Sequence, residues 1–292
     1  MRRWQLRHYA FFLGIDPSPL GVHPYSLPPR PDAVVDSGEI GFRRVKVPLL
    51  VPSPVRGFVG SDALANIAYW VSVGRGPYPS LLVDIGTNVE IVLLLGPERA
   101  TFTSVAGGPA FEDMSLSGAQ AGGSGGGTAG SGEVAPPGSL VVDVLAGLLD
   151  SGEVDPSGRL RRGLSLAVEA EGRGFVLSQR FVRQFQLSKA ALAAAVQTLL
   201  ELAGVEVPAL RRVVITGLFG NRLRHESAMR VGMLPRLPLS RFLSIADMPL
   251  MGAELLTHRP YLCAVRHAMR YVPIDGNRRF KENFNRNLGF PR

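Results

Sequence analysis

Asp84 and the three residues that follow Ile85 are the first candidates for chemistry in this chain. Gly86, Thr87 and Asn88 have turn-forming types and come directly after an apolar run that ends at Asp84. Backbone N–H groups of such a turn, with threonine and asparagine side chains, can surround a phosphate, and the carboxylate can hold Mg²⁺. The alternative is an ordinary hairpin turn capped by Asp84, which spacing alone favours.

A second candidate follows the apolar segment Arg211-Arg212-Val213-Val214-Ile215-Thr216, where Gly217, Gly220 and Asn221 occur within five residues. Open α/β sheets bind ligands at the carboxyl ends of their strands, and glycines there allow a flat ligand to lie against the backbone. A tight strand-to-helix connection without a ligand explains the same residues, and taken alone it is favoured.

A third candidate set has the spacing of one helix face. Arg183, Gln186 and Lys189 recur every three residues, so they can point basic and amide groups into a cleft. A solvated helix face is the usual explanation of such a pattern. Phe280 and Phe284 stand four residues apart in the basic C-terminal segment, which indicates a packing stripe with charged residues outside it.

Several site classes are excluded by the composition. Cys263 is the only cysteine, so this chain forms no internal disulfide, no cysteine-ligated zinc site and no iron–sulfur cluster of its own. No Gly-Lys dipeptide occurs, which excludes the GxxxxGK[ST] phosphate loop. The five histidines form no HExxH motif, which argues against a zinc protease.

The net charge of +8 is unevenly distributed along the chain. Residues 1–56 hold eight basic and four acidic residues, and residues 259–292 hold eight basic and two acidic, while the centre is slightly acidic. We therefore expect no nucleic-acid partner, and we expect the arginines of the two ends to face either a missing protein segment or an acidic partner. No run of 18 uncharged apolar residues occurs, so we predict no membrane span and a cytoplasmic protein.

The elements that must position the candidates follow from residue patterns. Ser61 is expected to be the N-cap of a helix, and strands at 81–84, 90–95 and about 100–105 predict an antiparallel meander. Seven glycines in residues 122–132 indicate a flexible linker. Alternating α/β structure follows, with helices predicted at 140–149, 183–203, about 227–231, 249–257 and 260–269, and strands at 174–177, 211–216 and 242–245.

Read in order, these segments resemble the ATPase region of the reductive activators of corrinoid proteins, which are iron–sulfur ATPases of the acetate and sugar kinase, heat-shock chaperone and actin superfamily. The most specific segments are DIGTN at 84–88, GGPAFE at 107–112, and GLFGN at 217–221 with its continuation HESAMRVGMLP. The C-terminal stretch YVPIDGNRRFKENFNRNLGFP belongs to the same collinear pattern. The similarity extends from about residue 13 to residue 291.

The resemblance implies an α/β fold, a ribonuclease-H-like lobe of the actin and sugar-kinase type, and ATP with Mg²⁺ as cofactors. It implies that the second-lobe phosphate loop is Asp84, Gly86, Thr87 and Asn88, with Asp84 as the magnesium ligand. It further implies adenosine contacts from Gly217, Gly220 and Asn221, a cleft border at Gly107 and Gly108, and a nearby helix carrying Gln186 and Lys189.

The chain also departs from the family pattern. Its only DxGT motif is at Asp84, whereas the family has another in its first lobe, and the family's ferredoxin module does not appear. We therefore expect residues 1–78 to be a remnant of the first lobe, with an incomplete first lobe overall, and residues 79–292 to be the second lobe. Nucleotide binding is expected to be weak and hydrolysis by this chain alone slow or absent.

An alternative from another class stays open. The chain can be a non-catalytic interaction module that docks on a corrinoid protein, or on a separately encoded ferredoxin and first-lobe chain. A neighbouring reading frame encoding a ferredoxin with its own DIGTT lobe is the observation that would favour this alternative.

Overall fold

The computed structural model describes residues 10, 13–21, 32–41, 47–53, 60–73, 76–86, 88–107, 138–170, 172–217, 219–274 and 276–292. The strands are β1 (Ala33–Asp36), β2 (Pro48–Val51), β3 (Ser80–Ile85), β4 (Asn88–Gly96), β5 (Arg99–Ala106), β6 (Ser165–Ala170), β7 (Arg173–Ser178), β8 (Arg212–Thr216), β9 (Phe242–Ser244) and β10 (Met269–Tyr271). The helices are α2 (Ser61–Ser72), α3 (Gly138–Asp150), α4 (Gln179–Ala203), α5 (His225–Arg230), α6 (Met248–Leu256), α7 (Arg259–Ala268) and α8 (Arg278–Arg286).

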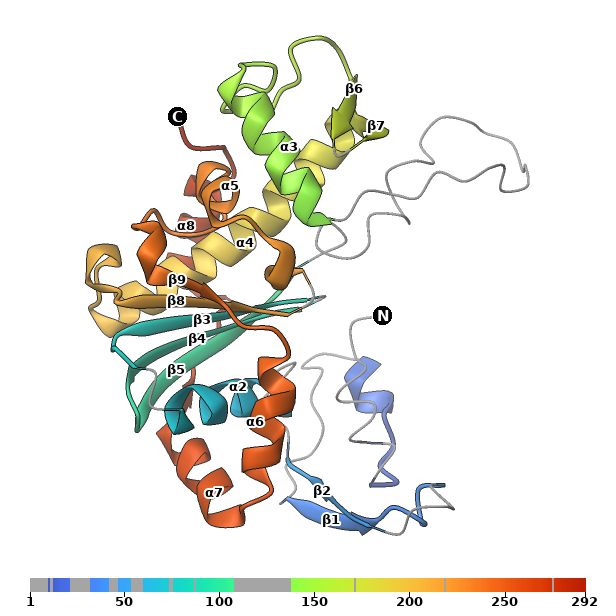
Figure 1. The fold of residues 1–292 in the computed structure, drawn as a ribbon, viewed down its shortest axis with the longest axis vertical. Coiled ribbons are helices and arrows are strands. Elements are labelled where there is room, and N and C mark those ends of the chain that lie inside the picture. Colours follow the sequence, from blue (N-terminus) through green and yellow to red (C-terminus); the bar gives the residue numbers. More distant parts are fainter. Residues whose placement is uncertain are drawn as a thin grey trace.

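A six-stranded sheet in the order β10-β5-β4-β3-β8-β9 forms the centre of the molecule (Figure 1). Strands β3, β4 and β5 make the predicted antiparallel meander, while β8 pairs in parallel with β3 on one side and with β9 on the other. The meander therefore leads into parallel strands reached through helical connections. This is the mixed sheet of a ribonuclease-H-like lobe, and it places the carboxyl ends of β3 and β8 at the same edge.

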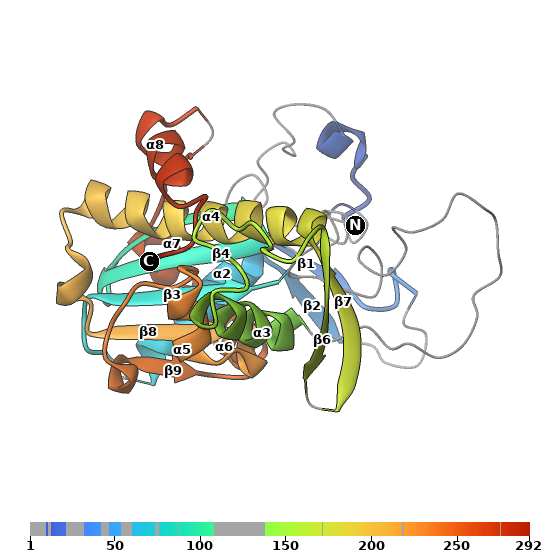
Figure 2. The ribbon, with the colours of Figure 1, turned by 90° about the horizontal axis from the view of Figure 1, so that it is seen from above.

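Helices cover both faces of this sheet, and alternate strand residues decide which face each side chain meets. Leu81, Val83 and Ile85 pack with α3 and α4, whereas Leu82 packs with α2, α6 and α7. Figures 1 and 2 show α4 and α8 on one side and α2 and α6 on the other. Side chains from even-numbered positions of β3 therefore face α2.

Helix α4 matches the sequence expectation and extends it. It begins four residues before the predicted start, where the Ser178 hydroxyl accepts the backbone N–H of Phe181 at 3.2 Å and caps the helix. It ends at Gly204, whose φ of 67° makes the left-handed turn that favours glycine. The predicted N-cap at Ser61 is wrong by one residue, because Gly60 occupies that position.

Residues 61–72 share one apolar core with the sheet. Ile67 and Trp70 of α2 are buried against strands β3, β4 and β5 and against α6. The packing of α2 on the sheet is therefore continuous, and the boundary after residue 78 stays a prediction. The predicted glycine linker at 122–132 lies outside the described residues.

In the part of the chain that the structure describes, no helix is both long enough and apolar enough to cross a lipid bilayer.

Candidate functional site

The edge formed by the carboxyl ends of β3 and β8 gathers most of the candidate residues. Asp84 is paired in register with Thr216 of β8 on one side and with Glu90 of β4 on the other. The turn between β3 and β4 is closed by the Gly86 backbone N–H, which donates to the Asn88 carbonyl at 3.0 Å. Residue pairing thus puts acidic and hydroxyl side chains in one row across the sheet.

Helix α2 brings two further polar residues against this row. The Asn66 side-chain amide donates to Asp84 Oδ2 at 2.8 Å. Asp62 lies in the first turn of the same helix, four residues before Asn66. One carboxylate oxygen from each of Asp62, Asp84 and Glu90 lies within 4.8 Å of the other two. Oxygen donors at this spacing suit a hard divalent cation such as Mg²⁺.

The acidic cluster of Asp62, Asp84 and Glu90 holds protons more tightly than isolated carboxylates do. Burial raises the pKa of Asp84 to about 6, the hydrogen bond from Asn66 opposes the rise, and the charge of Asp62 adds to it. Burial, together with the charges of Asp62 and Asp84, raises the pKa of Glu90 well above its usual range. A cation bound here would remove the repulsion among these groups.

Three buried oxygens beside this cluster have no hydrogen-bond partner among the described residues: Asn66 Oδ1, Thr216 Oγ1 and Asn221 Oδ1. Asn66 and Thr216 are 2% and 1% exposed, so leaving these oxygens unpaired carries a desolvation cost. The orphaned oxygens can accept hydrogen bonds from magnesium-bound water, and carboxylate oxygens are ligands that a magnesium ion prefers. The residues present therefore fit a magnesium ion.

Gly217 gives this edge a surface that no other residue type would leave open. Its φ is 89°, and an added Cβ would lie 2.6 Å from both Asp84 Oδ1 and the Ile85 carbonyl oxygen. Gly220 is equally restricted, since its Cβ would lie 2.7 Å from Ile215 Cγ2. Asn221 follows in a short 3₁₀ helix at Gly220–Arg222, where its backbone N–H donates to the Gly217 carbonyl at 3.0 Å.

The structure thus brings together Asp84, Gly86, Asn88, Gly217, Gly220 and Asn221, and Gly107 lies at the same edge immediately after β5. Thr87 and Gly108 lie outside the described residues.

Gln186 and Lys189 are not at this edge. Both belong to α4, on the sheet face opposite the Asp84 side chain, and their polar contacts hold other parts of the chain. Gln186 Nε2 donates to the carbonyls of Ser157 and Leu288, and Lys189 Nζ donates to the carbonyl of Gly289. Burial lowers the pKa of Lys189 to about 8. Their observed role is to fasten the C-terminal segment to α4.

Sequence reasoning missed Asp62, Asn66, Glu90 and Thr216 as members of the site. The spacing of Asp62 and Asn66 was a usable signal, because residues four apart share one helix face. The place of Glu90 beside Asp84 could not be predicted without the register of the hairpin, because the register sets which residue of β4 lies opposite Asp84.

The cluster gives the folded protein a pH-dependent stability. A carboxyl whose pKa is raised by folding stabilises the fold while it is protonated, and this stabilisation is lost as pH rises from about 4 through about 6. For Asp84 the expected loss is on the order of 3 kcal/mol of unfolding free energy. Urea unfolding at pH 5 and pH 7.5 measures about half of this loss, roughly 1.4 kcal/mol, as the difference between the wild type and Asp84→Asn. An equal pH dependence in both proteins would contradict the assignment.

Comparisons with known proteins agree with this architecture. A solved structure, the reductive activator for corrinoid,iron-sulfur protein, superposes with a TM-score of 0.74 and 23% sequence identity, covering 97% of this chain and 51% of that one. At this identity the likeness shows the fold alone. It confirms the predicted actin and sugar-kinase type of α/β fold.

Two curated relatives also match in sequence. The corrinoid activation enzyme RamQ of Eubacterium limosum is 28% identical over 237 residues, which are 68% of this chain and 39% of RamQ. The [Co(II) methylated amine-specific corrinoid protein] reductase of Methanosarcina barkeri is 38% identical over 69 residues, 24% of this chain and 12% of that protein. The chain thus spans less than two fifths of the length of either relative.

One family profile, described as the C-terminal domain of RACo, the ASKHA domain, matches residues 133–292, which is more than half of the chain. The predicted kinship with reductive activators of corrinoid proteins is therefore confirmed. This chain belongs to the family of the RACo C-terminal ASKHA domain.

Proposed function

We propose that this chain is an ATPase-like domain that binds magnesium and adenine nucleotide at the edge formed by β3 and β8, and that it serves the reductive activation of a corrinoid protein. The observation that carries the proposal is the combination of Asp84, its carboxylate neighbours and the close glycine at 217. Membership of the family and the names of RamQ and the Methanosarcina reductase support the corrinoid partner.

Each part of the edge has a defined task in this proposal. The magnesium ion supplies positive charge that neutralises the phosphates, and Asp84 holds it. The β3–β4 turn is closed by the Gly86 N–H, and we propose that the side chains of Thr87 and Asn88 meet the phosphates there. Gly217, Gly220 and Asn221 provide the surface against which the nucleoside lies, with Gly107 and Gly108 bordering it.

The three carboxylates also make nucleotide binding depend on a cation. Phosphates that approach Asp62, Asp84 and Glu90 without a cation meet like charge in a partly desolvated place, which opposes binding. Binding is therefore expected to require Mg²⁺ and to be weak, with a Kd on the order of 100 μM. Positioning and charge stabilisation around the phosphates set the rate of phosphoryl transfer, so we propose slow or no hydrolysis by this chain alone.

Isothermal titration of the full chain tests this proposal. Titration with Mg–ATP should give saturable heat, and the same titration in excess EDTA should give an affinity at least tenfold lower. Mg–GTP is the matched control for base recognition at residues 217–221. The proposal is overturned if Mg–ATP gives no binding heat at millimolar concentration, or if EDTA leaves the affinity unchanged.

A further inference from the structure

A pocket of about 250 Å³ lies far from the nucleotide edge, among α4, the segment after α5 and the C-terminal segment. Its walls are mainly apolar side chains, among them Val196, Met229, Met233 and Pro235. Ala193 of α4 also lines it. Gln197 and Asn287 also line it, but they bind each other, because Asn287 Nδ2 donates to Gln197 Oε1 at 2.9 Å. The pocket therefore offers mainly apolar contact to a ligand.

The volume sets the size of what can enter. A space of about 250 Å³ is large enough for one bulky apolar side chain and smaller than the clefts of about 300–1,000 Å³ that hold drug-sized molecules. Residues 229–235 belong to the HESAMRVGMLP motif and supply five of the twelve lining residues, and the nucleotide edge uses none of them. The HESAMRVGMLP motif thus forms part of the wall of this pocket.

In the described part of the chain, the one charged residue that lines the pocket is basic. Arg236 lines it and is exposed, and Arg286 and Arg292 each stand one residue from a lining residue. Arg230 also adjoins the lining, but it is engaged with Asp150 at 2.5 Å and with the Pro291 carbonyl at 3.0 Å. Glu206, next to Val207, is the acidic residue adjoining the lining on the described chain. The surroundings of the pocket therefore carry a positive excess.

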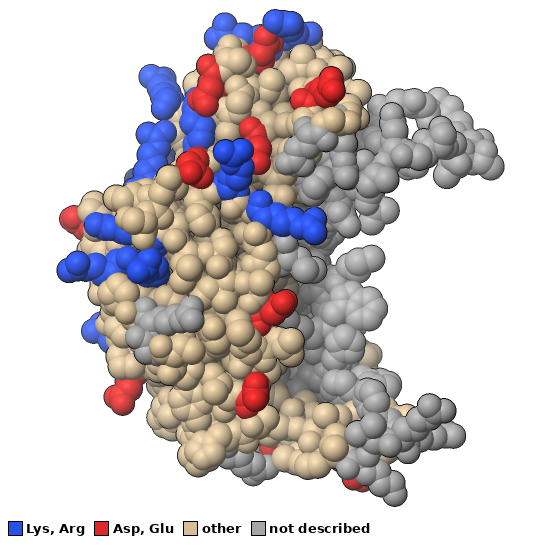
Figure 3. All heavy atoms as spheres, viewed as in Figure 1, with Lys and Arg blue, Asp and Glu red and all other residues tan. Residues whose placement is uncertain are grey.

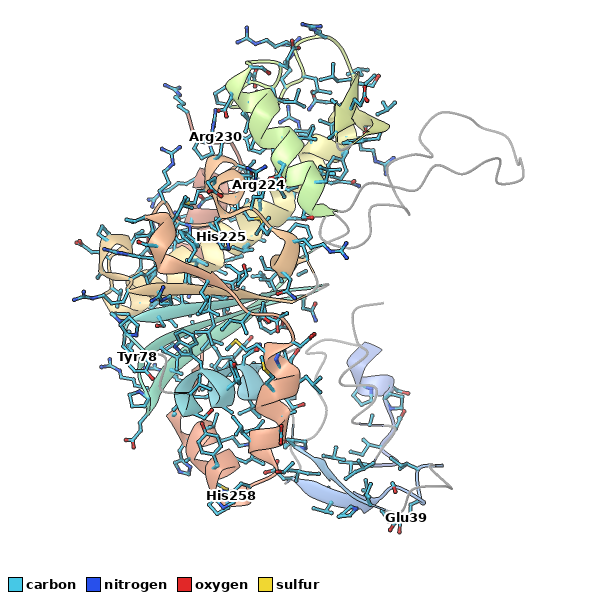
Figure 4. All side chains as sticks on the ribbon, viewed as in Figure 1. Glu39, Tyr78, Arg224, His225, Arg230 and His258 are labelled. Atoms are coloured by element: carbon cyan, nitrogen blue, oxygen red, sulfur yellow. The ribbon has the colours of Figure 1, made fainter. Side chains whose placement is uncertain are left out.

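The wider surface carries many basic side chains. Figure 3 shows Lys and Arg side chains along one side of the upper part of the molecule, over the region where Figure 1 places α4, α5 and α8, with Asp and Glu side chains among them. Figure 4 shows Arg224 and Arg230 on this part of the chain, around α5. The outer face of α8 contributes Arg278, Arg279, Lys281 and Arg286, against one acid, Glu282, which pairs with Arg278 at 2.8 Å.

We infer that this pocket is a docking site for an acidic segment of a partner protein, which inserts one bulky apolar side chain between Met229 and Met233 while its carboxylates meet Arg236 and neighbouring guanidinium groups. An apolar anchor in a closed pocket supplies most of the affinity, and the surrounding charges supply selectivity and faster association. The inference does not depend on nucleotide binding.

Fluorescence polarisation with defined peptides tests it on the full chain. The probes are labelled nine-residue peptides of Glu and Asp with a central leucine, methionine or phenylalanine, and matched peptides with a central alanine or with lysine flanks. The apolar, acidic peptides should bind at least fivefold more tightly than the alanine-centred and lysine-flanked ones. The inference is wrong if none of them binds at 1 mM protein, or if the centre residue has no effect.

Variants separate docking from general charge attraction. Arg236→Glu should weaken the best peptide at least fivefold, and Ala193→Met, which fills the pocket from α4 with a good helix former, should do the same. Arg180→Glu is the control, because Arg180 is exposed on α4 about 20 Å from Ala193 along the helix axis. Equal losses in Arg180→Glu and Arg236→Glu would contradict a specific site.

Methionine labelling observes the pocket directly. The chain has seven methionines, of which Met229 and Met233 line the pocket. With ¹³C-methyl methionine, the two corresponding NMR signals, assigned by Met→Leu variants, should shift on peptide addition. Shifts confined to other methionines would place the peptide elsewhere and overturn the inference.

Discussion

Asp84→Asn should lower the affinity for Mg–ATP by thirty- to a hundredfold, which is about 2–3 kcal/mol of binding free energy. The substitution keeps the shape of the side chain but removes the charge that holds the cation. The interactions of a charged group with its partners are worth roughly this much when they are sheltered from water. Titration calorimetry at fixed free Mg²⁺ measures the change.

The same variant should not be less stable than the wild type at neutral pH. Asp84 is one of three carboxylates that repel one another in a partly buried cluster, so removing its charge is expected to raise the unfolding free energy by on the order of 1 kcal/mol. A loss of binding with an equal or higher melting temperature would separate function from folding. Glu254→Gln, an exposed change on α6, is the control and should alter neither quantity.

Gly252→Ala should have the largest effect on stability, a loss on the order of 3 kcal/mol. Gly252 lies within α6, where an added Cβ would lie 1.8 Å from the Ala65 carbonyl oxygen of α2. Alanine favours a helix over glycine by about 1 kcal/mol, but separating two packed helices costs more, so the clash decides the sign. The melting temperature should fall by several degrees.

Gly147→Ala is the matched control for this change. Gly147 is also helical, in α3, but an added Cβ there meets nothing within 4 Å. The substitution should therefore raise the unfolding free energy by up to about 1 kcal/mol. Opposite signs at the two glycines, measured by urea unfolding, are the expected result. A stabilised Gly252→Ala variant would show that α2 and α6 do not pack so closely.

The large helices and the central strands could be predicted from local patterns. The helix over α4 was indicated by its alanine and leucine content and by Gly204, and β8 by its unbroken apolar run. Strands β6 and β10 were not predicted. The alternating Ser165–Ala170 packs one face on the core, and Met269–Tyr271 is three residues long and depends on parallel pairing with β5. The pairing of β10 comes from distant residues and leaves no local pattern, whereas the alternation of β6 is a local strand signal.

Some residues of the candidate site could likewise be predicted from local patterns, and others could not. Asp84 and Gly217 were named from strand ends, and the parallel pairing of β3 with β8 puts them side by side. Gln186 and Lys189 were named from helical spacing, which fixes a helix face but does not say what that face meets. The face meets the C-terminal segment, where Phe290 stacks on Phe185 with ring centroids 6.4 Å apart. Only the tertiary packing reveals this contact.

A crystal structure of the full chain with Mg²⁺ and a non-hydrolysable ATP analogue tests the central claim most directly. The account predicts the phosphates at the β3–β4 turn, the magnesium ion within 4.5 Å of an Asp84 carboxylate oxygen whether it is bound directly or through water, and the adenosine against Gly217 and Gly220. Density for the nucleotide at another place, or magnesium away from Asp84, would contradict it.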